Sequence, residues 1–236
     1  MRTKNYNDNE YEDYSINRKL KVSDNDNGKL IDYFLTEEIE SIDDYIDFLR
    51  EVEMAKPNDS IRLHINCYGG DVNVALNIYD ALRNTEANVQ VNIEGIAASA
   101  ASMIMLAGNY WSIYPHSCVM IHAWSSFSYG KWNELEDRFK FEKEIWENQF
   151  REIYKKFLTD EEIEQCLKGK DFWFSADETS KRLDNYQAEE AAKNSAANSI
   201  VEKYTQMMQK EFDLLNKQKA VPKTPSKKKQ TVKPKK

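Results

Sequence analysis

The chain has 236 residues, 31% of them charged, and a formal net charge of −7. This length allows a full hydrophobic core, either in one domain with appendages or in two small domains. The last 20 residues contain nine lysines and no acidic residue, so the rest of the chain carries about −16, which argues against nucleic acid as the main partner.

The N-terminal segment, residues 1–28, is polar and aperiodic, and we expect it to be a flexible arm. From residue 29 onward, short apolar runs alternate with segments of helical spacing. The predicted elements are a strand at 29–35, a helix at 39–52, a strand at 61–66, a helix at 72–83 and a strand at 89–93. This order predicts an α/β domain with parallel strands and right-handed crossovers.

The segment from Gly95 to His122 organises the rest of this domain. Its small residues predict an apolar helix of about three turns that begins near Ala98, and the apolar run 118–122 predicts a buried strand. No stretch is long and apolar enough to span a membrane, and the N-terminus lacks the apolar core of a signal peptide. We therefore expect a cytoplasmic protein that does not contact a membrane.

A long helix is predicted at residues 131–157, after a loop at 123–129. It is too long for a small domain to cover its apolar stripe, so we expect it to pack against another subunit. A capped short helix after Thr159, an aromatic strand at 171–174 and a further helix follow. We therefore divide the chain into an arm at 1–28, a folded domain at 29–188, an extension helix at 189–216 and a disordered lysine-rich tail at 217–236.

The three cysteines, Cys67, Cys118 and Cys166, are widely spaced and form no C-x-x-C pair. This pattern supports neither a disulfide framework nor a zinc site, and it favours buried small side chains.

Three side chains at the ends of predicted elements form a candidate catalytic set: Ser99, His122 and Asp171. Ser99 lies at a predicted helix N-terminus, where unpaired N–H groups favour the negative charge of acyl transfer. His122 would take the serine proton, and Asp171 would fix the tautomer of the imidazole. The backbone N–H groups of Gly70 and Ala100 would form an oxyanion hole. Taken singly, each of these residues also suits an ordinary role as a cap, a turn or a satisfied polar group.

In order and spacing, these residues resemble the proteolytic subunit of the Clp protease, a serine peptidase family with the crotonase-like fold. The resemblance runs from about Ile31 to Ala176. Its motifs are Phe34-Leu35-Thr36, Ile65-Asn66 with Gly69-Gly70, Ile78-Tyr79-Asp80, Gly95 with Ala97-Ala98-Ser99, Pro115 with Ser117, Val119-Met120-Ile121-His122, and Asp171 with Phe174-Ser175-Ala176. The resemblance implies an α/β fold of repeated β-β-α units in a superhelix, from which a long handle helix protrudes.

The same resemblance implies a serine endopeptidase that hydrolyses unfolded polypeptides. It sets Ser99 at the family's nucleophile, His122 at its base and Asp171 at its triad acid, with Gly70 and Ala100 as the oxyanion-hole donors. It further implies two stacked heptameric rings around a closed chamber, an ATP-dependent AAA+ unfoldase as partner, and neither a metal nor an organic cofactor. The chain itself has no phosphate-binding G-x-x-x-x-G-K-[ST] sequence.

Departures from the family pattern keep alternatives open. Tyr68 stands where the family usually has proline, Ala100 where it has methionine, and Ala123-Trp124 where it commonly has Gln-Pro.

Ser102, one turn after Ser99, is a rival nucleophile. A virus-type head-maturation protease of the same fold is one alternative, because the sequence is divergent and its tail is unusual. A catalytically weak ring subunit with an assembly or regulatory role is another, although all three triad residues are present. An acyl-CoA hydratase or isomerase would not need such a set and is disfavoured.

Overall fold

The computed structural model describes residues 19–26, 28–125 and 129–219. The chain divides into two compact units, Met1–Glu189 and Glu190–Lys236. Most of the expected arm (1–18), the middle of the loop that follows His122 (126–128) and most of the lysine-rich tail (220–236) lie outside the described residues.

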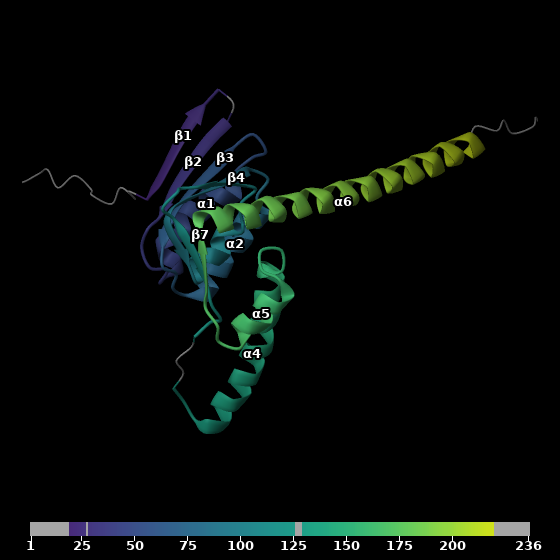
Figure 1. The fold of residues 1–236 in the computed structure, drawn as a ribbon. Helices are drawn as coiled ribbons and strands as arrows, with labels where there is room; N and C mark the ends of the chain where they lie inside the picture. Colours follow the sequence, from purple (N-terminus) through teal and green to yellow (C-terminus); the bar gives the residue numbers. More distant parts are fainter. Residues whose placement is uncertain (1–18, 27, 126–128, 220–236) are drawn as a thin grey trace, which may run out of the picture. The chain divides into compact units, whose positions relative to one another are not determined.

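The first unit is built on a mixed sheet of seven strands (Figure 1), in the order β1-β2-β3-β4-β6-β7, with β5 paired to β4 beside that path. The strands are β1 (Leu20–Asn25), β2 (Gly28–Leu35), β3 (Ser60–Cys67), β4 (Asn88–Ala98), β5 (Tyr110–Ile113), β6 (Cys118–Ile121) and β7 (Phe172–Ser175). As predicted, β2, β3 and β4 are parallel. Strands β5 and β6 also run parallel to β4, whereas β1 and β7 are antiparallel to their neighbours.

Order begins earlier in the chain than the sequence predicted, because β1 lies inside the expected flexible arm. Leu20 pairs with Tyr33 of β2, and the register continues to the pair of Asn25 and Gly28. An edge strand needs apolar residues on only one face, and Val22 is still 39% exposed. Its polar composition gave no sign of this strand, which is ordered by pairing with its neighbour β2.

Strand β4 is longer than the predicted strand at 89–93, and it pairs with β5 along its first part (Gln90–Ile93) and with β6 along its last part (Ile96–Ala98). The small residues at its end were expected to begin a helix. Ala97 and Ala98 are instead fully buried between neighbouring strands, so the strand ends directly before Ser99.

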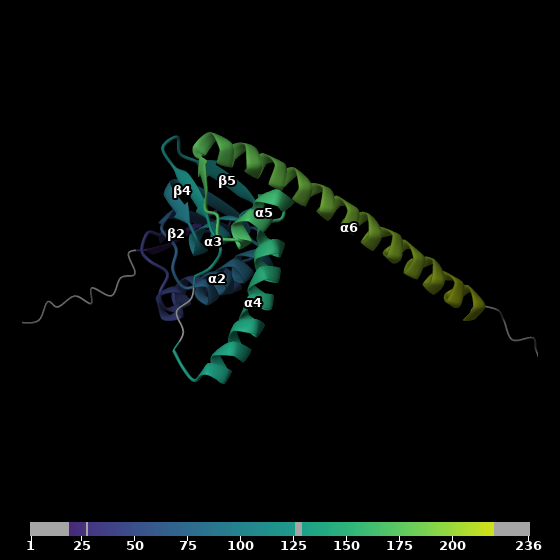
Figure 2. The ribbon, with the colours of Figure 1, turned by 60° about the horizontal axis from the view of Figure 1, so that its bottom comes forward.

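Helices α1, α2 and α3 pack against one face of this sheet (Figure 2), where the alternate apolar residues of β2, β3 and β4 are buried. The helical segments of the first unit are η1 (Ile42–Tyr45), α1 (Ile46–Met54), α2 (Val72–Asn84), α3 (Ala100–Met105), α4 (Trp132–Tyr154) and α5 (Asp160–Leu167), followed by the start of α6 (Ala176–Lys219). The helix predicted at 39–52 begins late because Ile39 is extended and forms a β-bridge with Gly70. Helix α3 has 6 residues and is thus shorter than the expected three turns.

Helix α6 also accounts for the described residues of the second unit. The sequence predicted two helices here and a disordered tail from residue 217, but the helix is continuous from Ala176 to Lys219. No glycine or proline occurs within it, so nothing in its composition stops the helix at residue 189. Within the described ranges, no helix combines the length and the apolar composition needed to cross a membrane.

Candidate active site

Ser99 occupies the sharp turn between β4 and α3. Its backbone has φ 54° and ψ −126°, and among the residues described it is the one non-glycine residue with a positive φ. Its N–H donates to the carbonyl of Met120 at the end of β6 (2.9 Å). A strained strand-to-helix turn of this kind presents a nucleophile at the edge of a sheet, and such strain persists only where the surroundings hold it.

His122 lies beside this serine because β4 and β6 end together. Ala98 pairs with Met120, and His122 follows two residues later. The distance from His122 Nε2 to Ser99 Oγ is 2.7 Å. With the proton on Nδ1, the Nε2 atom accepts a hydrogen bond from the hydroxyl, which is the geometry of a general base and its nucleophile.

Asp171 lies at the same end of the sheet but is less firmly held. It directly precedes β7, whose antiparallel register with β6 pairs Phe172 with Ile121, so the next pair along would be Asp171 and His122. The side chain is exposed, and no hydrogen bond joins these two described residues. Burial and, after it, the charge of Asp171 raise the pKa of the Cys166 thiol to about 11. The structure thus brings two of the three predicted residues into contact and leaves the third nearby.

The glycine pair packs directly against the serine turn. Gly69 has φ +105°, and a Cβ added to it would lie 2.8 Å from Ser99 Cβ and 3.0 Å from Ala100 N. The β-bridge with Ile39 fixes the turn, since Ile39 N donates to Gly69 O (2.9 Å) and Asp71 N donates to Ile39 O (2.6 Å). Among the turn, loop and cap hydrogen bonds of the described residues, none is donated by the N–H groups of Gly70 or Ala100. Both are the predicted oxyanion-hole donors.

Asn66 and Cys67, which precede the glycine pair, form hydrogen bonds that support this part of the site. The sequence did not predict these roles. Cys67 Sγ accepts the N–H of Gly69 (3.3 Å) and donates to the carbonyl of Glu37 (3.0 Å). Asn66 Oδ1 accepts the N–H of Ile96 on β4 (3.2 Å). Cys67 is buried and free, as expected, but it is also a hydrogen-bonding residue. Its position two residues before Gly69 was the only sequence signal for this role.

Ser102, the rival nucleophile, is fully buried. Its hydroxyl donates to the carbonyl of Ser99 (2.6 Å) and contacts the hydroxyl of Tyr154 (2.6 Å). Both sides of this hydroxyl are therefore occupied by the protein, whereas Ser99 is partly accessible. The geometry favours Ser99 over Ser102 as the side chain that a substrate can reach.

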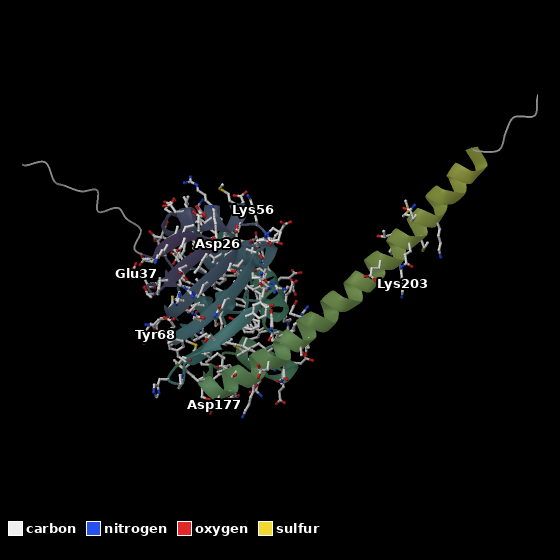
Figure 3. All side chains as sticks on the ribbon, turned by 90° about the horizontal axis from the view of Figure 1, so that it is seen from above. Asp26, Glu37, Lys56, Tyr68, Asp177 and Lys203 are labelled. Atoms are coloured by element: carbon white, nitrogen blue, oxygen red, sulfur yellow. The ribbon has the colours of Figure 1, made fainter. Side chains whose placement is uncertain are left out.

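A small apolar pocket adjoins Ser99 and His122. Its further lining is mainly aromatic and aliphatic: Val72, Ala100, Met103, Trp124, Trp146, Phe150 and Tyr154. The rings of Trp124 and Trp146 lie 6.2 Å apart between centroids. Tyr68, which is labelled in Figure 3, is outside this lining and is 77% exposed. The pocket therefore places an apolar surface next to the serine hydroxyl.

Among the residues that the structure describes, no three His, Cys, Asp or Glu side chains are grouped so that they could hold a metal ion. The chemistry available at this site is that of a hydroxyl, an imidazole and backbone N–H groups.

Comparison with known proteins identifies the family to which the chain belongs. The model of the Clp protease family matches residues 30–182. The ATP-dependent Clp protease proteolytic subunit of Deinococcus radiodurans is 31% identical over 134 residues, which cover 55% of this chain and 65% of that protein. The corresponding subunit of Bacteroides thetaiotaomicron is 28% identical over 129 residues, which cover 54% and 59%. The chain thus spans less than two thirds of the length of these curated relatives. Because the family model covers more than half of the sequence, the chain belongs to the Clp protease family.

Proposed function

We propose that the protein is a serine endopeptidase in which Ser99 is the nucleophile, His122 the general base and Asp171 the residue that orients the imidazole. The N–H groups of Gly70 and Ala100 are the oxyanion-hole donors. The site needs neither a metal nor an organic cofactor for this chemistry. The observation that carries the proposal is the contact of 2.7 Å between His122 Nε2 and Ser99 Oγ, made by a serine whose backbone is held at φ 54°.

In the proposed reaction, Ser99 Oγ attacks the carbonyl carbon of the scissile peptide bond while its proton passes to His122 Nε2. The N–H groups of Gly70 and Ala100 donate to the oxygen that becomes negative. The imidazolium then gives the proton to the leaving amine, so the peptide C–N bond breaks and an acyl group stays on Ser99. Water, deprotonated by His122, then attacks the acyl carbon. The bond from that carbon to Ser99 Oγ breaks, the imidazolium returns the proton to Oγ, and the carboxylic acid product leaves.

The test is covalent labelling of the full chain with a fluorophosphonate probe. We expect one label on Ser99, and we expect Ser99→Ala to abolish both labelling and peptide hydrolysis without changing the thermal unfolding temperature. Ser112→Ala, which alters a half-buried serine on β5, serves as the matched control and keeps both activities. Labelling that persists in Ser99→Ala would contradict the assignment. An assembled but unlabelled wild-type protein would favour the catalytically weak ring subunit.

The proposal includes the assembly that the family resemblance implies. Helix α4 exposes apolar side chains along its length, including Trp132 (81% exposed) and Phe141 (66%), which a neighbouring copy would cover. We propose a crotonase-like superhelical domain in two stacked heptameric rings, located in the cytoplasm, that degrades unfolded polypeptides delivered by an AAA+ unfoldase. Mass measurement of the full chain at micromolar concentration should give a ring assembly. A monomer would remove the chamber from the proposal.

A virus-type head-maturation protease is the second candidate. One observation favours it: α6 continues to Lys219, whereas the family model ends at residue 182. An assembled protein that hydrolyses unfolded polypeptide with an AAA+ unfoldase would support the first proposal. Cleavage confined to one folded partner or to the chain's own C-terminal part would support the second.

A further inference from the structure

A buried chain of hydroxyl groups connects α4 to the carbonyl of Ser99. The Tyr154 hydroxyl lies 2.6 Å from Ser102 Oγ, and Ser102 Oγ lies 2.6 Å from the Ser99 carbonyl oxygen. Ser102 is 0% and Tyr154 is 2% exposed. Neither hydroxyl is needed to fill space, because alanine and phenylalanine would keep most of the packing.

The direction of these hydrogen bonds follows from the number of protons. A serine hydroxyl has one hydrogen, and Ser102 donates it to the Ser99 carbonyl, so the Tyr154 hydroxyl must donate to Ser102 Oγ. Burial raises the pKa of Tyr154 above its ordinary range, and the bond to Ser102 offsets only part of that rise. The phenol therefore keeps its proton and remains a donor at neutral pH.

We propose that Tyr154, acting through Ser102, is a positioning residue that holds the Ser99 turn in its strained conformation. The proposal rests on the proposed function of Ser99 as nucleophile. A serine with φ 54° returns to an ordinary backbone conformation unless neighbouring groups prevent it. The Ser99 carbonyl accepts both the N–H (2.9 Å) and the hydroxyl of Ser102, so the plane of the Ser99–Ala100 peptide, and with it the direction of the Ala100 N–H, is fixed.

Tyr154 is well placed to transmit the position of α4 to this turn. It is the last residue of α4, and its ring packs on that of Phe150 with centroids 4.5 Å apart. Both rings line the pocket beside Ser99. The same helix thus forms one wall of the pocket and fixes the backbone of the nucleophile.

Tyr154→Phe removes the donor and keeps the ring. We expect the maximal rate of fluorophosphonate labelling to fall about twofold to tenfold, the range that one hydrogen bond contributes. The probe concentration at half-maximal rate should change by less than about twofold, because the pocket wall is retained. Tyr186→Phe is the matched control: its buried hydroxyl donates to Leu106 O (3.2 Å) at the other end of α3. It should lower the unfolding temperature by about as much as Tyr154→Phe and leave the labelling rate unchanged.

Ser102→Ala removes the middle hydroxyl of the hydrogen-bonded series that runs from Tyr154 through Ser102 to the Ser99 carbonyl. It removes the direct bond to Ser99 and leaves the buried Tyr154 hydroxyl without an acceptor, so both the labelling rate and the unfolding temperature should fall further than in Tyr154→Phe. Adding Tyr154→Phe to Ser102→Ala removes that unpaired hydroxyl. The double variant should therefore regain about 2–4 °C of unfolding temperature without regaining any labelling rate.

Two outcomes would overturn the inference. One is a labelling rate in Tyr154→Phe equal to that in Tyr186→Phe; the other is a labelling rate in the double variant that recovers together with its stability. Failure of the proposed function looks different, because wild-type protein would then not be labelled at Ser99 at all.

Discussion

The two halves of the candidate active site are held very differently. The nucleophile half, formed by the Ser99 turn and the Gly69–Gly70 turn, is fixed by backbone hydrogen bonds, by the Cys67 thiol and by close contacts between the two turns. The acid half contains Asp171, which is exposed and has no hydrogen bond to the described His122. The chain by itself thus orders the proposed nucleophile and the proposed oxyanion donors more firmly than the residue proposed to orient the imidazole.

This difference indicates which parts of the site depend on local backbone and which depend on the surroundings. The strained φ of Ser99 and the positive φ values of Gly69 and Gly70 are properties of the folded first unit. The position of Asp171 follows from the register of two short strands, β6 and β7. We therefore expect substitutions in the nucleophile half to reduce activity more than substitutions in the acid half.

The strongest test of the nucleophile half is Gly69→Ala. Its Cβ would meet the Ala98 carbonyl oxygen and Ser99 Cβ, both at 2.8 Å, so the serine turn has to move. A displacement of a reacting group by about 1 Å costs about 10²-fold in rate, and we expect at least that loss in kcat/KM for peptide hydrolysis. The measurement is steady-state hydrolysis by correctly assembled protein.

Gly169→Ala is the control for this substitution. Gly169 has a similar φ (+99°), but a Cβ there meets nothing within 4 Å. Both alanines carry the backbone strain, about 1–3 kcal/mol, so both should lower the free energy of unfolding. Only Gly69→Ala should reduce activity. An equal loss of activity in the two variants would show that strain, not contact with Ser99, is responsible.

Asp171→Asn probes the acid half and should have a smaller effect. Replacing a triad acid that is buried and bonded to its histidine costs about 10⁴-fold in kcat. Because Asp171 is exposed, we expect about 10- to 100-fold here, with little change in thermal stability. Asp177→Asn, at an exposed position at the start of α6 (labelled in Figure 3), is the control and should leave kcat unchanged. A loss near 10⁴-fold would mean that the carboxylate reaches His122 in the working enzyme, and the contrast between the halves would then disappear.

The residues of the nucleophile half could be identified from the sequence, because Gly70 and His122 follow apolar strand patterns and Ser99 lies at a predicted helix start. The convergence of Ser99 and His122 depends on β4 and β6 ending together, and the sequence did not predict this, because the small residues at the end of β4 were expected to begin a helix. The catalytic roles themselves stay a prediction. The sequence also predicted that Asp171 contacts His122, and the structure has no hydrogen bond between these two described residues.

Other features could not be read from local patterns because their partners are distant in the chain. Strand β1 is polar and owes its structure to β2, and β4 extends through an alanine-rich segment because β6 pairs with it. The bond from Cys67 to the glycine turn and the one from Tyr154 to Ser102 join groups whose residue types suggest only burial. Their roles appear only when the backbone geometry is known.

The smallest expected effect on activity concerns the framework of the acid half, which is braced by Arg182. Its guanidinium bonds to both oxygens of Glu162 (2.7 and 2.9 Å) and to the carbonyl of Phe157 (2.8 Å), and it lies 4.5 Å from the ring centroid of Phe174 on β7. Hydrogen bonding from Arg182 lowers the pKa of Glu162 below its ordinary value of 4.5, against the opposing effect of burial. Glu162→Gln should therefore lower the free energy of unfolding at pH 7 by about 1–3 kcal/mol, while the amide retains the capping bond to Thr159.

The pH dependence of that loss follows from the sign of the shift. A carboxyl group whose pKa is lowered on folding stabilises the protein above its unfolded pKa, and the stabilisation is lost as the pH falls through the folded pKa. Denaturant unfolding should show wild type and Glu162→Gln separated at pH 7 and converging below pH 4.5. Glu164→Gln, which breaks a more exposed pair with Arg151, should show a smaller separation. If Glu162→Gln lowers kcat as steeply as Asp171→Asn, the brace itself positions Asp171, and the acid half is more ordered than its exposure suggests.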